Sequence, residues 1–224
     1  MYEMKGKETY SYGIIGLGRF GTALAKTLAE AGKEVVVIDH MESKVKELRQ
    51  YTESAFVSED LSREVLEEIG IQNCDTVVVC IGEKIDTSIL TTLNVVSLGV
   101  PRVIAKAISP EQGEVLEKIG AEVVYPERDM ALRLAKRLLT NNILDYINLN
   151  NDVEITEISI TQVIAGKTVL ELDLRKTYGL NIIAVEHDRR TDTEVGPDYR
   201  FQQGDIIVVI GKTQNVKRFE QYLS

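Results

Sequence analysis

Three closely spaced glycines lie between an apolar run and a periodic segment near the start of the chain. They belong to the hexapeptide Gly16-Leu17-Gly18-Arg19-Phe20-Gly21, which follows the β-branched run Ser11–Ile15. In a loop of this kind the first glycine permits a tight turn and the second lets a pyrophosphate approach the backbone. The third lets the following helix pack closely on a sheet. The spacing therefore indicates a phosphate-binding loop at the beginning of a helix, where free N–H groups and the helix dipole favour an anion.

An acidic residue at the end of the next apolar run strengthens this interpretation. Asp39 ends the run Glu34–Asp39, at the distance from Gly21 that a ribose-binding carboxylate requires. Such a carboxylate accepts hydrogen bonds from both ribose hydroxyls, and its charge disfavours a 2′-phosphate. We therefore expect a nucleotide site built on Gly16, Gly18, Gly21 and Asp39. The alternative is a fold of this type that has lost its ligand.

Two further charged residues fit a phosphate-rich ligand. Arg19 lies inside the loop, where a guanidinium suits a di- or triphosphate, and the alternative is a solvated surface arginine. Glu127 follows Pro126 at the end of the last expected parallel strand. A carboxylate near phosphates calls for a cation between them, which hints at Mg²⁺. The alternative is that Glu127 merely favours the first turn of its own helix.

Residues that would carry out a reaction on a nucleotide are not evident. The two histidines, His40 and His187, have no plausible nucleophile near them in the sequence, and no H-E-x-x-H, G-x-S-x-G or P-loop lysine motif occurs. The segment after Asn150 is too short to form a typical substrate domain over a nicotinamide ring. We expect a binding protein and not an enzyme. A small NAD-dependent oxidoreductase and an NAD(H)-dependent redox sensor remain as alternatives.

The elements that must position these residues alternate regularly over the first 126 residues. Short β-branched runs are each followed by a turn and an amphipathic segment; the runs are Ser11–Ile15, Glu34–Asp39, Ser54–Val57, Thr76–Ile81, Arg102–Ala105 and Glu122–Tyr125. Runs nearly continuous in Val and Ile are typical of strands buried on both faces of a parallel sheet. The pattern predicts an α/β fold with a Rossmann-type, doubly wound parallel sheet.

The helix expected after Pro126 has apolar residues on more than one side. Met130, Leu134 and Leu138 form one stripe, while Leu132 and Leu139 lie on another part of its surface. One sheet cannot cover both sides, so a second subunit is the expected partner. Docking against the C-terminal part of the chain is the alternative.

From Asn150 onward the pattern changes to that of a small α+β domain. Glu154–Ile160 alternates with period two, Asn181–Glu186 and Asp205–Ile210 are further expected strands, and Asn215–Leu223 is an expected closing helix. We therefore expect a nucleotide-binding domain over residues 1–140, including the helix after Pro126. Residues 141–152 are expected to form a linker or interface segment, and residues 153–224 a small ligand-binding α+β domain.

Composition excludes several classes of protein. The net charge of −9 argues against nucleic acid or an anionic membrane surface as partner. The two cysteines match no disulfide scaffold or metal pattern. No apolar stretch is long enough to span a bilayer, and the polar segment Met1–Thr9 has no signal-peptide core. A cytoplasmic protein is expected.

These motifs together resemble the regulatory RCK (regulator of potassium conductance) subunits of bacterial potassium uptake systems of the Ktr and Trk type. The resemblance covers essentially the whole chain, and the length fits the single-copy Ktr subunit better than the tandem Trk form. It is carried by the glycine loop 16–21, Val37-Ile38-Asp39, Ile81-Gly82 with Thr87–Leu93, Ala105-Lys106-Ala107, Leu116-Glu117-Lys118-Ile119-Gly120-Ala121 and Pro126-Glu127-Arg128-Asp129-Met130.

The resemblance implies a ligand for the N-terminal domain, namely ATP, ADP or NAD(H). The residues that it assigns to this site are Gly16, Gly18, Arg19, Phe20, Gly21, Asp39, Lys106 and Glu127. By residue match the glycines would hold the phosphates, Asp39 the ribose and Arg19 the terminal phosphates. Glu127 would help to hold a divalent cation, Mg²⁺, near the γ-phosphate at a dimer contact. Lys106 would lie near the nucleotide.

The same resemblance implies an assembly and a partner. Homodimers would assemble into a ring, usually an octamer, that docks on the cytoplasmic face of a membrane potassium-translocating subunit and gates it. ATP would favour the active state and ADP the inactive one. We therefore expect a cytoplasmic protein that is peripheral at the inner face of the cell membrane.

A second ligand, cyclic di-AMP, is implied for the C-terminal domain. The positions that match its pocket are Val169, Leu170, Arg175, Asn181 and Pro197. An arginine can pair with phosphate and an asparagine with an adenine edge, so both residue types suit the ligand. The alternative is that these are ordinary surface residues.

Overall fold

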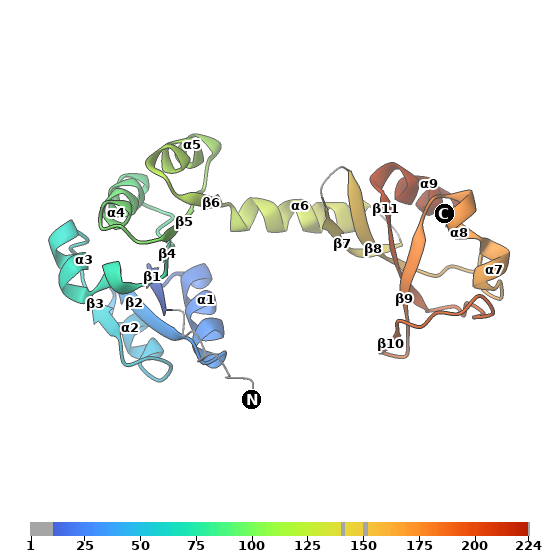
Figure 1. Cartoon of the computed structure of the whole chain (residues 1–224), viewed down its shortest axis with the longest axis horizontal. Coiled ribbons are helices and arrows are strands. Elements are labelled where there is room, and N and C mark those ends of the chain that lie inside the picture. Colours follow the sequence, from blue (N-terminus) through green and yellow to red (C-terminus); the bar gives the residue numbers. More distant parts are fainter. Residues whose placement is uncertain (1–10, 140–141, 150–151, 224) are drawn as a thin grey trace, which may run out of the picture. The chain divides into compact units, whose positions relative to one another are not determined.

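The computed structural model describes residues 11–139, 142–149 and 152–223, which fall into two compact units (Figure 1). The N-terminal unit ends at Asp129 and the C-terminal unit begins at Met130. The segment 1–10, in which no signal-peptide core was found, lies outside the described residues. Residues 140–141 and 150–151 of the expected linker segment and its borders also lie outside them.

The N-terminal unit contains a six-stranded parallel sheet with the order β3-β2-β1-β4-β5-β6. Its strands are β1 (Ser11–Ile15), β2 (Glu34–Asp39), β3 (Ala55–Val57), β4 (Thr76–Val79), β5 (Arg102–Lys106) and β6 (Glu122–Val124). The order reverses at β1, which pairs with both β2 and β4. Ligands of such sheets bind outside the carboxyl ends of the strands at this reversal. The doubly wound sheet expected from the sequence is confirmed.

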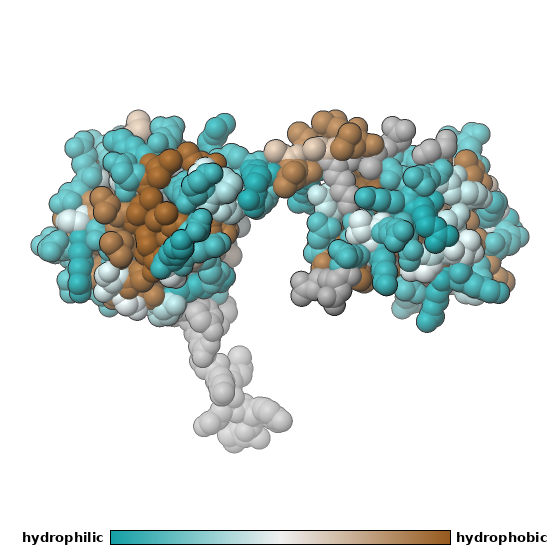
Figure 2. Space-filling view, turned by 90° about the horizontal axis from the view of Figure 1, so that it is seen from above, coloured by the Kyte–Doolittle hydropathy of each residue, from teal (hydrophilic) through white to brown (hydrophobic). Residues whose placement is uncertain are grey.

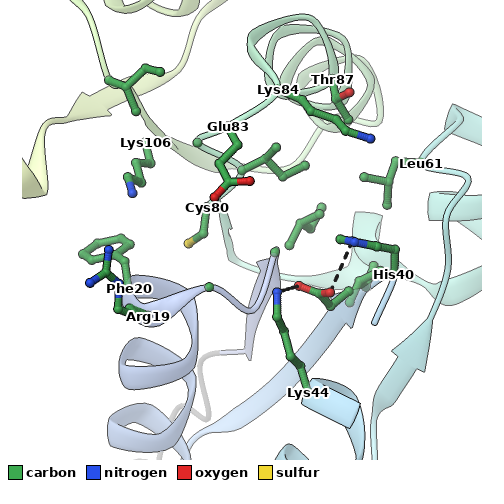
Figure 3. A pocket seen from close by; sticks show the side chains of 18 of the residues that line it. Arg19, Phe20, His40, Lys44, Leu61, Cys80, Glu83, Lys84, Thr87 and Lys106 are labelled. Atoms are coloured by element: carbon green, nitrogen blue, oxygen red, sulfur yellow. Dashed lines mark ion pairs between the residues drawn. The ribbon is translucent and has the colours of Figure 1, made fainter. Parts of the chain in front are cut away.

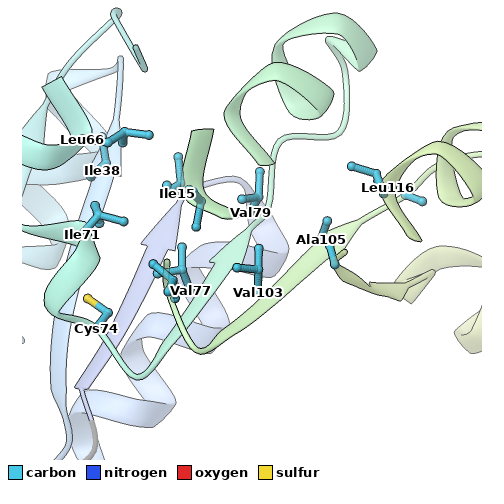
Figure 4. Packing of buried hydrophobic residues seen from close by; sticks show 14 residues of the cluster. Ile15, Ile38, Leu66, Ile71, Cys74, Val77, Val79, Val103, Ala105 and Leu116 are labelled. Carbon is cyan, nitrogen blue, oxygen red and sulfur yellow. The ribbon is translucent and has the colours of Figure 1, made fainter. Parts of the chain in front are cut away.

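Helices cover both faces of this sheet because successive strand residues point to opposite faces. The helical elements of this unit are α1 (Arg19–Glu30), α2 (Glu42–Leu48), α3 (Arg63–Ile69), the short η1 (Ile71–Asn73), α4 (Ile85–Ser97) and α5 (Pro110–Ile119). The next helix, α6 (Pro126–Leu139), begins in this unit and continues into the C-terminal one. Ile14 packs in one cluster with Ala25 of α1 and Val45 of α2. Ile15 packs in another with Val95 of α4 (Figure 4).

The C-terminal unit contains a five-stranded antiparallel sheet with the order β10-β9-β11-β8-β7. Its elements are β7 (Ile143–Asn148), β8 (Val153–Ser159), α7 (Val169–Leu172), α8 (Leu174–Thr177), β9 (Asn181–His187), β10 (Arg190–Asp192), β11 (Ile206–Lys212) and α9 (Thr213–Leu223). Its core includes Phe201 and Phe219, which are 1% and 0% exposed. The expected second α+β domain is therefore present.

The structure differs from the expected linker at residues 141–152. Ile143–Asn148 form β7, an edge strand that pairs antiparallel with β8. Asp145 of this strand accepts two hydrogen bonds from the guanidinium of Arg133 in α6. Exposure rises along β7 from buried Ile143 to exposed Ile147 without alternating, so no period of two identifies this strand. The division between the units also falls within α6, and not after it.

A buried carboxylate in the C-terminal unit makes its stability depend on pH. Asp205 is fully buried, and its Oδ1 lies 2.6 Å from Nδ1 of His187. Its Oδ2 accepts hydrogen bonds from the Tyr199 hydroxyl and the Gln202 backbone N, each at 2.8 Å. The hydrogen bond to Asp205, together with the nearby charge of Asp188, raises the pKa of His187 above its ordinary value.

We expect the C-terminal unit to lose stability as the pH rises through this raised pKa. The contribution of protonated His187 is fully present below the unfolded-state value of about 6.5 and disappears above the folded-state value. Amide hydrogen exchange in β9 and β11, compared at roughly pH 6 and pH 8.5 after correction for intrinsic rates, measures the effect. His187→Gln, which keeps a hydrogen-bonding side chain but does not titrate, should remove the pH dependence. Equal dependence in both proteins would contradict the role of His187.

Candidate functional site

A cavity of about 670 Å³ lies at the carboxyl ends of the parallel strands (Figure 3). Its lining includes seven of the eight residues predicted for nucleotide binding, namely Gly16, Gly18, Arg19, Phe20, Asp39, Lys106 and Glu127. The eighth, Gly21, lies in the first turn of α1 directly behind the loop. Residues that are up to 111 positions apart in the sequence (16 to 127) thus line one cavity.

The three loop glycines are required for different reasons. Gly16 has a φ of +98°, which side chains rarely adopt. A Cβ on Gly21 would lie 2.0 Å from the carbonyl oxygen of Gly16, so this glycine lets α1 pack against the loop. Gly18 has an ordinary φ of −72°, and a Cβ there would meet nothing within 4 Å. No contact within the described chain requires glycine at position 18, whereas a phosphate approaching the backbone would.

The N-terminus of α1 is open to the cavity. Gly18 is its N-cap residue, no described side chain caps it, and its first turn contains no acidic residue. The N-termini of α2, α3 and α4 likewise have no side-chain cap, whereas α5 is capped by Ser109, whose side chain accepts a hydrogen bond from the Gln112 backbone N. Uncapped N–H groups and the positive end of the helix dipole favour an anion at α1. This end of the cavity is suited to phosphate.

Asp39 is buried and lines the other end of the cavity. Its Oδ2 accepts a hydrogen bond from the Leu17 backbone N at 2.5 Å, and its Oδ1 accepts one from Met41 N at 2.8 Å. Nζ of Lys44 lies 3.6 Å from Oδ2, and Nδ1 of His40 lies 3.3 Å from Oδ1. Each carboxylate oxygen has a second lone pair for a ribose hydroxyl. Through its hydrogen bond with Leu17 N, Asp39 also fixes the glycine loop, a role that the sequence did not reveal.

Three charged residues gather at the phosphate end. Nζ of Lys106 lies 2.5 Å from Oε1 of Glu127, and Arg19 and Lys106 lie on the same side of the cavity in Figure 3. The hydrogen bond from Lys106, reinforced by the charge of Arg19, lowers the pKa of Glu127. Glu127 therefore has a cationic partner within the chain, which the sequence did not indicate. Its carboxylate stays ionised at neutral pH.

A magnesium ion at this site would need most of its ligands from elsewhere. Among the residues that the structure describes, no group of three or more His, Cys, Asp or Glu side chains could hold a metal ion. Mg²⁺ is commonly bound through one or two carboxylates together with substrate phosphates and water. Glu127 is the carboxylate predicted for this role, and Glu59 and Glu83 also line the cavity.

Several cavity residues were not identified from the sequence. Lys44, Ser58, Glu59, Glu83 and Lys84 all line the cavity. Their common signal is position, because each lies within a few residues of the carboxyl end of a parallel strand. Ligand-binding residues concentrate at that edge in doubly wound sheets. This rule, applied to every strand, would have found them.

The residues predicted for a second ligand are partly brought together in the C-terminal unit. The backbone N of Leu170 donates to the Pro197 carbonyl at 2.9 Å, and Val169 N donates to the Tyr199 carbonyl at 3.0 Å. Arg175 and Asn181 are exposed, in α8 and at the start of β9. A backbone hydrogen bond thus joins two of the five predicted residues, Leu170 and Pro197, and Val169 precedes Leu170 in the chain. The cyclic di-AMP site stays a prediction.

The comparison with known proteins defines first a class and then a family. The TrkA-N domain matches residues 12–126 and the TrkA-C domain matches residues 155–224, so this is a two-domain protein of the TrkA-N and TrkA-C class. "Ktr system potassium uptake protein C" of Bacillus subtilis is 40% identical over 94% of this chain and 96% of its own length. "Ktr system potassium uptake protein A" of the same organism is 34% identical over 98% of both chains. The chain belongs to this family of potassium uptake proteins.

Solved structures support the fold. The chain superposes on "GsuK channel bound to NAD" with a TM-score of 0.53 at 23% identity, covering 98% of this chain and 39% of that one. It superposes on the GsuK RCK domain with a TM-score of 0.52 at 24% identity, covering 98% of this chain and 47% of that one. The chain therefore spans less than half of these larger proteins. The resemblance stated from the sequence is confirmed, and the relatives are named as potassium uptake proteins and not as enzymes.

No helix among the described residues is long and apolar enough to cross a membrane.

Proposed function

We propose that this protein is a cytoplasmic regulatory subunit that binds ATP or ADP and thereby controls potassium movement through a separate membrane subunit. The named relatives support the link to potassium uptake. One observation carries the nucleotide role. The uncapped N-terminus of α1, with open space at Gly18, lies in the same cavity as a buried ribose-type carboxylate, Asp39.

The cavity suggests how the nucleotide lies. The ribose hydroxyls bind Asp39, and the phosphates extend across Gly18 towards Arg19 and Lys106. The helix N-terminus alone would neutralise only part of the phosphate charge. The cationic side chains of Arg19 and Lys106 at this end would neutralise more of it. Mg²⁺, where it accompanies the nucleotide, uses Glu127 as its protein ligand.

Arg19 and Glu127 are the proposed sensors of the third phosphate, and substitution there should change the preference between ATP and ADP. Arg19→Ala should cost ATP more affinity than ADP, by about 5- to 150-fold, the range of typical allosteric couplings. Glu127→Gln should abolish any stimulation of ATP binding by Mg²⁺. Titrations of each variant with ATP and ADP, with and without Mg²⁺, measure both effects.

The alternative role for Glu127 is to position Lys106, since the two form an ion pair. Lys106→Met separates these roles. If Glu127 acts on Mg²⁺, the Lys106 variant retains magnesium-dependent binding and the Glu127 variant does not. Wild-type preference for ATP over ADP in both the Arg19 and Glu127 variants would show that these residues are structural.

The exposed apolar surface of α6 is the proposed dimer contact. Leu138 and Leu139 are 77% and 85% exposed, and Met130, Leu132 and Leu134 are 60%, 60% and 51% exposed. This much apolar surface on one helix is typical of an interface. A second copy of the chain offers the same helix, and twofold symmetry makes such a contact self-complementary.

Substitution on α6 should dissociate the assembly. Leu132→Glu or Leu139→Glu places a charge in the proposed contact and should weaken it by at least about 2 kcal/mol, roughly 30-fold. Sedimentation velocity over a range of concentrations measures the shift towards smaller species. Val57→Glu, at an exposed apolar residue of β3, is the matched control and should leave assembly unchanged. A monomeric wild-type protein at micromolar concentration would contradict both the dimer and the gating mechanism.

A ring of dimers needs a second, different contact on each subunit. The N-terminal unit has a second group of exposed apolar residues on α4, on α5 and on the loop that precedes α5, namely Ile85, Leu90, Leu93, Ile108 and Val115. Figure 2 views the molecule from above relative to Figure 1, and it shows an apolar area on the face of this unit where α4 and α5 lie. We assign this α4–α5 surface to contacts between dimers, and an octameric ring would use both surfaces.

The C-terminal unit is the proposed site of a second ligand, cyclic di-AMP. Arg175 would pair with its phosphate and Asn181 with an adenine edge, beside the residues that Pro197 and Tyr199 hold through backbone bonds. Arg175→Ala should abolish binding of cyclic di-AMP without changing the affinity for ATP.

The gating role is tested by potassium flux in vesicles that contain the membrane subunit. The protein, added with ATP, should support faster flux than the same protein with ADP. Only a ligand that binds two ring states unequally can shift them, so equal flux with both nucleotides would contradict ATP/ADP gating. Peripheral attachment at the inner face of the membrane predicts that the protein sediments with these vesicles only when the membrane subunit is present.

A further inference from the structure

A buried glutamine lies between the nucleotide cavity and the α4–α5 surface. Gln112, in the first turn of α5, is 3% exposed. Its Oε1 accepts a hydrogen bond from the Ile108 backbone N at 2.9 Å, and its Nε2 donates to Oγ of Ser88 at 3.2 Å. Ser88 is fully buried in α4. One side-chain amide thus ties the loop between β5 and α5 to α4.

This arrangement differs from simple helix capping. In a capping box, a glutamine three residues after the N-cap serine turns back to the backbone N–H of that serine. Ser109 caps α5 here, but the Gln112 amide bonds the residue before the cap and a different helix. A buried amide that loses its partners is costly, so Ile108 and Ser88 are held at a fixed spacing.

Ile108 belongs to both the cavity and the apolar surface. It lines the cavity, two residues after Lys106, and its side chain is 52% exposed. Of the exposed large hydrophobic residues in the described part of the chain, it is the one that also lines the cavity. A change in the position of this loop therefore alters the cavity wall and the α4–α5 surface together.

We infer that Gln112 is a positioning residue, which holds Ile108 so that the occupancy of the nucleotide cavity changes contacts made by the α4–α5 surface. The inference rests on the function proposed above and names the residues through which it operates. The coupling is reciprocal, because a nucleotide that strengthens assembly must itself bind more tightly to the assembled protein. Gln112 need not touch the nucleotide for this role.

Substitution of Gln112 tests the inference. The measured quantity is the dependence of assembly on the bound nucleotide, and not the stability of the fold. The assembly constant of the full chain is measured by sedimentation with saturating ATP, with saturating ADP and without nucleotide. We expect the wild-type constants with ATP and ADP to differ by 5- to 150-fold, the usual range of allosteric coupling. In Gln112→Met, which removes both hydrogen bonds at similar volume, the ratio should fall to within about twofold of unity. Gln72→Met, at a half-buried glutamine of η1 remote from the cavity lining, should keep the wild-type ratio.

A second pair of variants keeps the test informative if Gln112→Met unfolds. Ile108→Ala should reduce the ratio, whereas Val115→Ala, on the same surface but not in the cavity lining, should weaken assembly equally with both nucleotides. A wild-type ratio retained in Gln112→Met and Ile108→Ala would overturn the inference alone. A wild-type protein that assembles equally with ATP, ADP and no nucleotide would overturn nucleotide-controlled assembly, and this inference with it.

Discussion

Two glycine-to-alanine substitutions in the same motif should have different consequences, one for stability and the other for nucleotide affinity. In Gly21→Ala the new Cβ would lie 2.0 Å from the Gly16 carbonyl oxygen, a backbone atom that cannot move without displacing α1. We expect the N-terminal unit to lose about 3 kcal/mol of stability, at the upper end of the range for overpacked cores. The corresponding shift in melting temperature is roughly 10 °C.

In Gly18→Ala the added methyl group meets nothing in the chain, so the fold should be nearly unaffected. Alanine is a poorer N-cap than glycine, and the cost is at most about 1 kcal/mol. Nucleotide affinity should nevertheless fall at least about tenfold, or 1.4 kcal/mol, because the methyl group occupies the space that a phosphate would enter. Thermal unfolding and calorimetric titration of both variants check the pair. A Gly18→Ala protein with wild-type affinity would show that no phosphate approaches this position.

The second large effect is expected at Asp39. Asp39→Ala removes the acceptor for the ribose hydroxyls and leaves the backbone N–H groups of Leu17 and Met41 without their partner. Affinity for ATP, ADP and NAD should fall alike, because all three contain the adenosine ribose. The expected loss is about 1.5–3 kcal/mol for a charged hydrogen-bonding group. Stability should fall as well, by about 1–3 kcal/mol for each N–H group left unsatisfied and buried.

Glu59→Ala is the matched control for Asp39, since Glu59 is another acidic residue of the cavity lining. It should reduce nucleotide affinity much less and leave the loop in place. Calorimetry with the three nucleotides and thermal unfolding without them separate binding from stability. Unchanged affinity in Asp39→Ala for all three nucleotides would remove Asp39 from the site.

The sequence predicted the parallel sheet well because its signals are local and repeated. Runs such as Glu34–Asp39 match the observed strand in full, since a strand buried on both faces is nearly continuous in β-branched residues. Short elements at the edge of a sheet carry weaker signals. Ile143–Asn148 was expected within a linker or interface segment, because its apolar residues follow the preceding helix with few polar residues between them. Pairing with β8, and not local propensity, makes it a strand.

The sequence predicted those residues of the candidate site whose type and spacing match a known binding motif. Gly16, Gly18 and Asp39 belong to a fixed spacing, so their positions in the cavity followed from the motif. The ion pair of Lys106 with Glu127 joins residues 21 positions apart on β5 and α6, and no spacing rule connects them. The contact of Asp39 with the Leu17 N–H likewise appears only once the loop is folded.

The most direct measurement is calorimetric titration of the nucleotide-free protein with ATP, ADP, NAD and NADH. The proposed function predicts that ATP and ADP each bind at one site per chain with different affinities, and that ATP displaces any bound NADH. Binding of both should be weakened in Gly18→Ala while the protein remains folded. Preferential binding of NADH over ATP would instead make the protein a redox sensor. A folded wild-type protein that binds none of the four nucleotides would contradict the account.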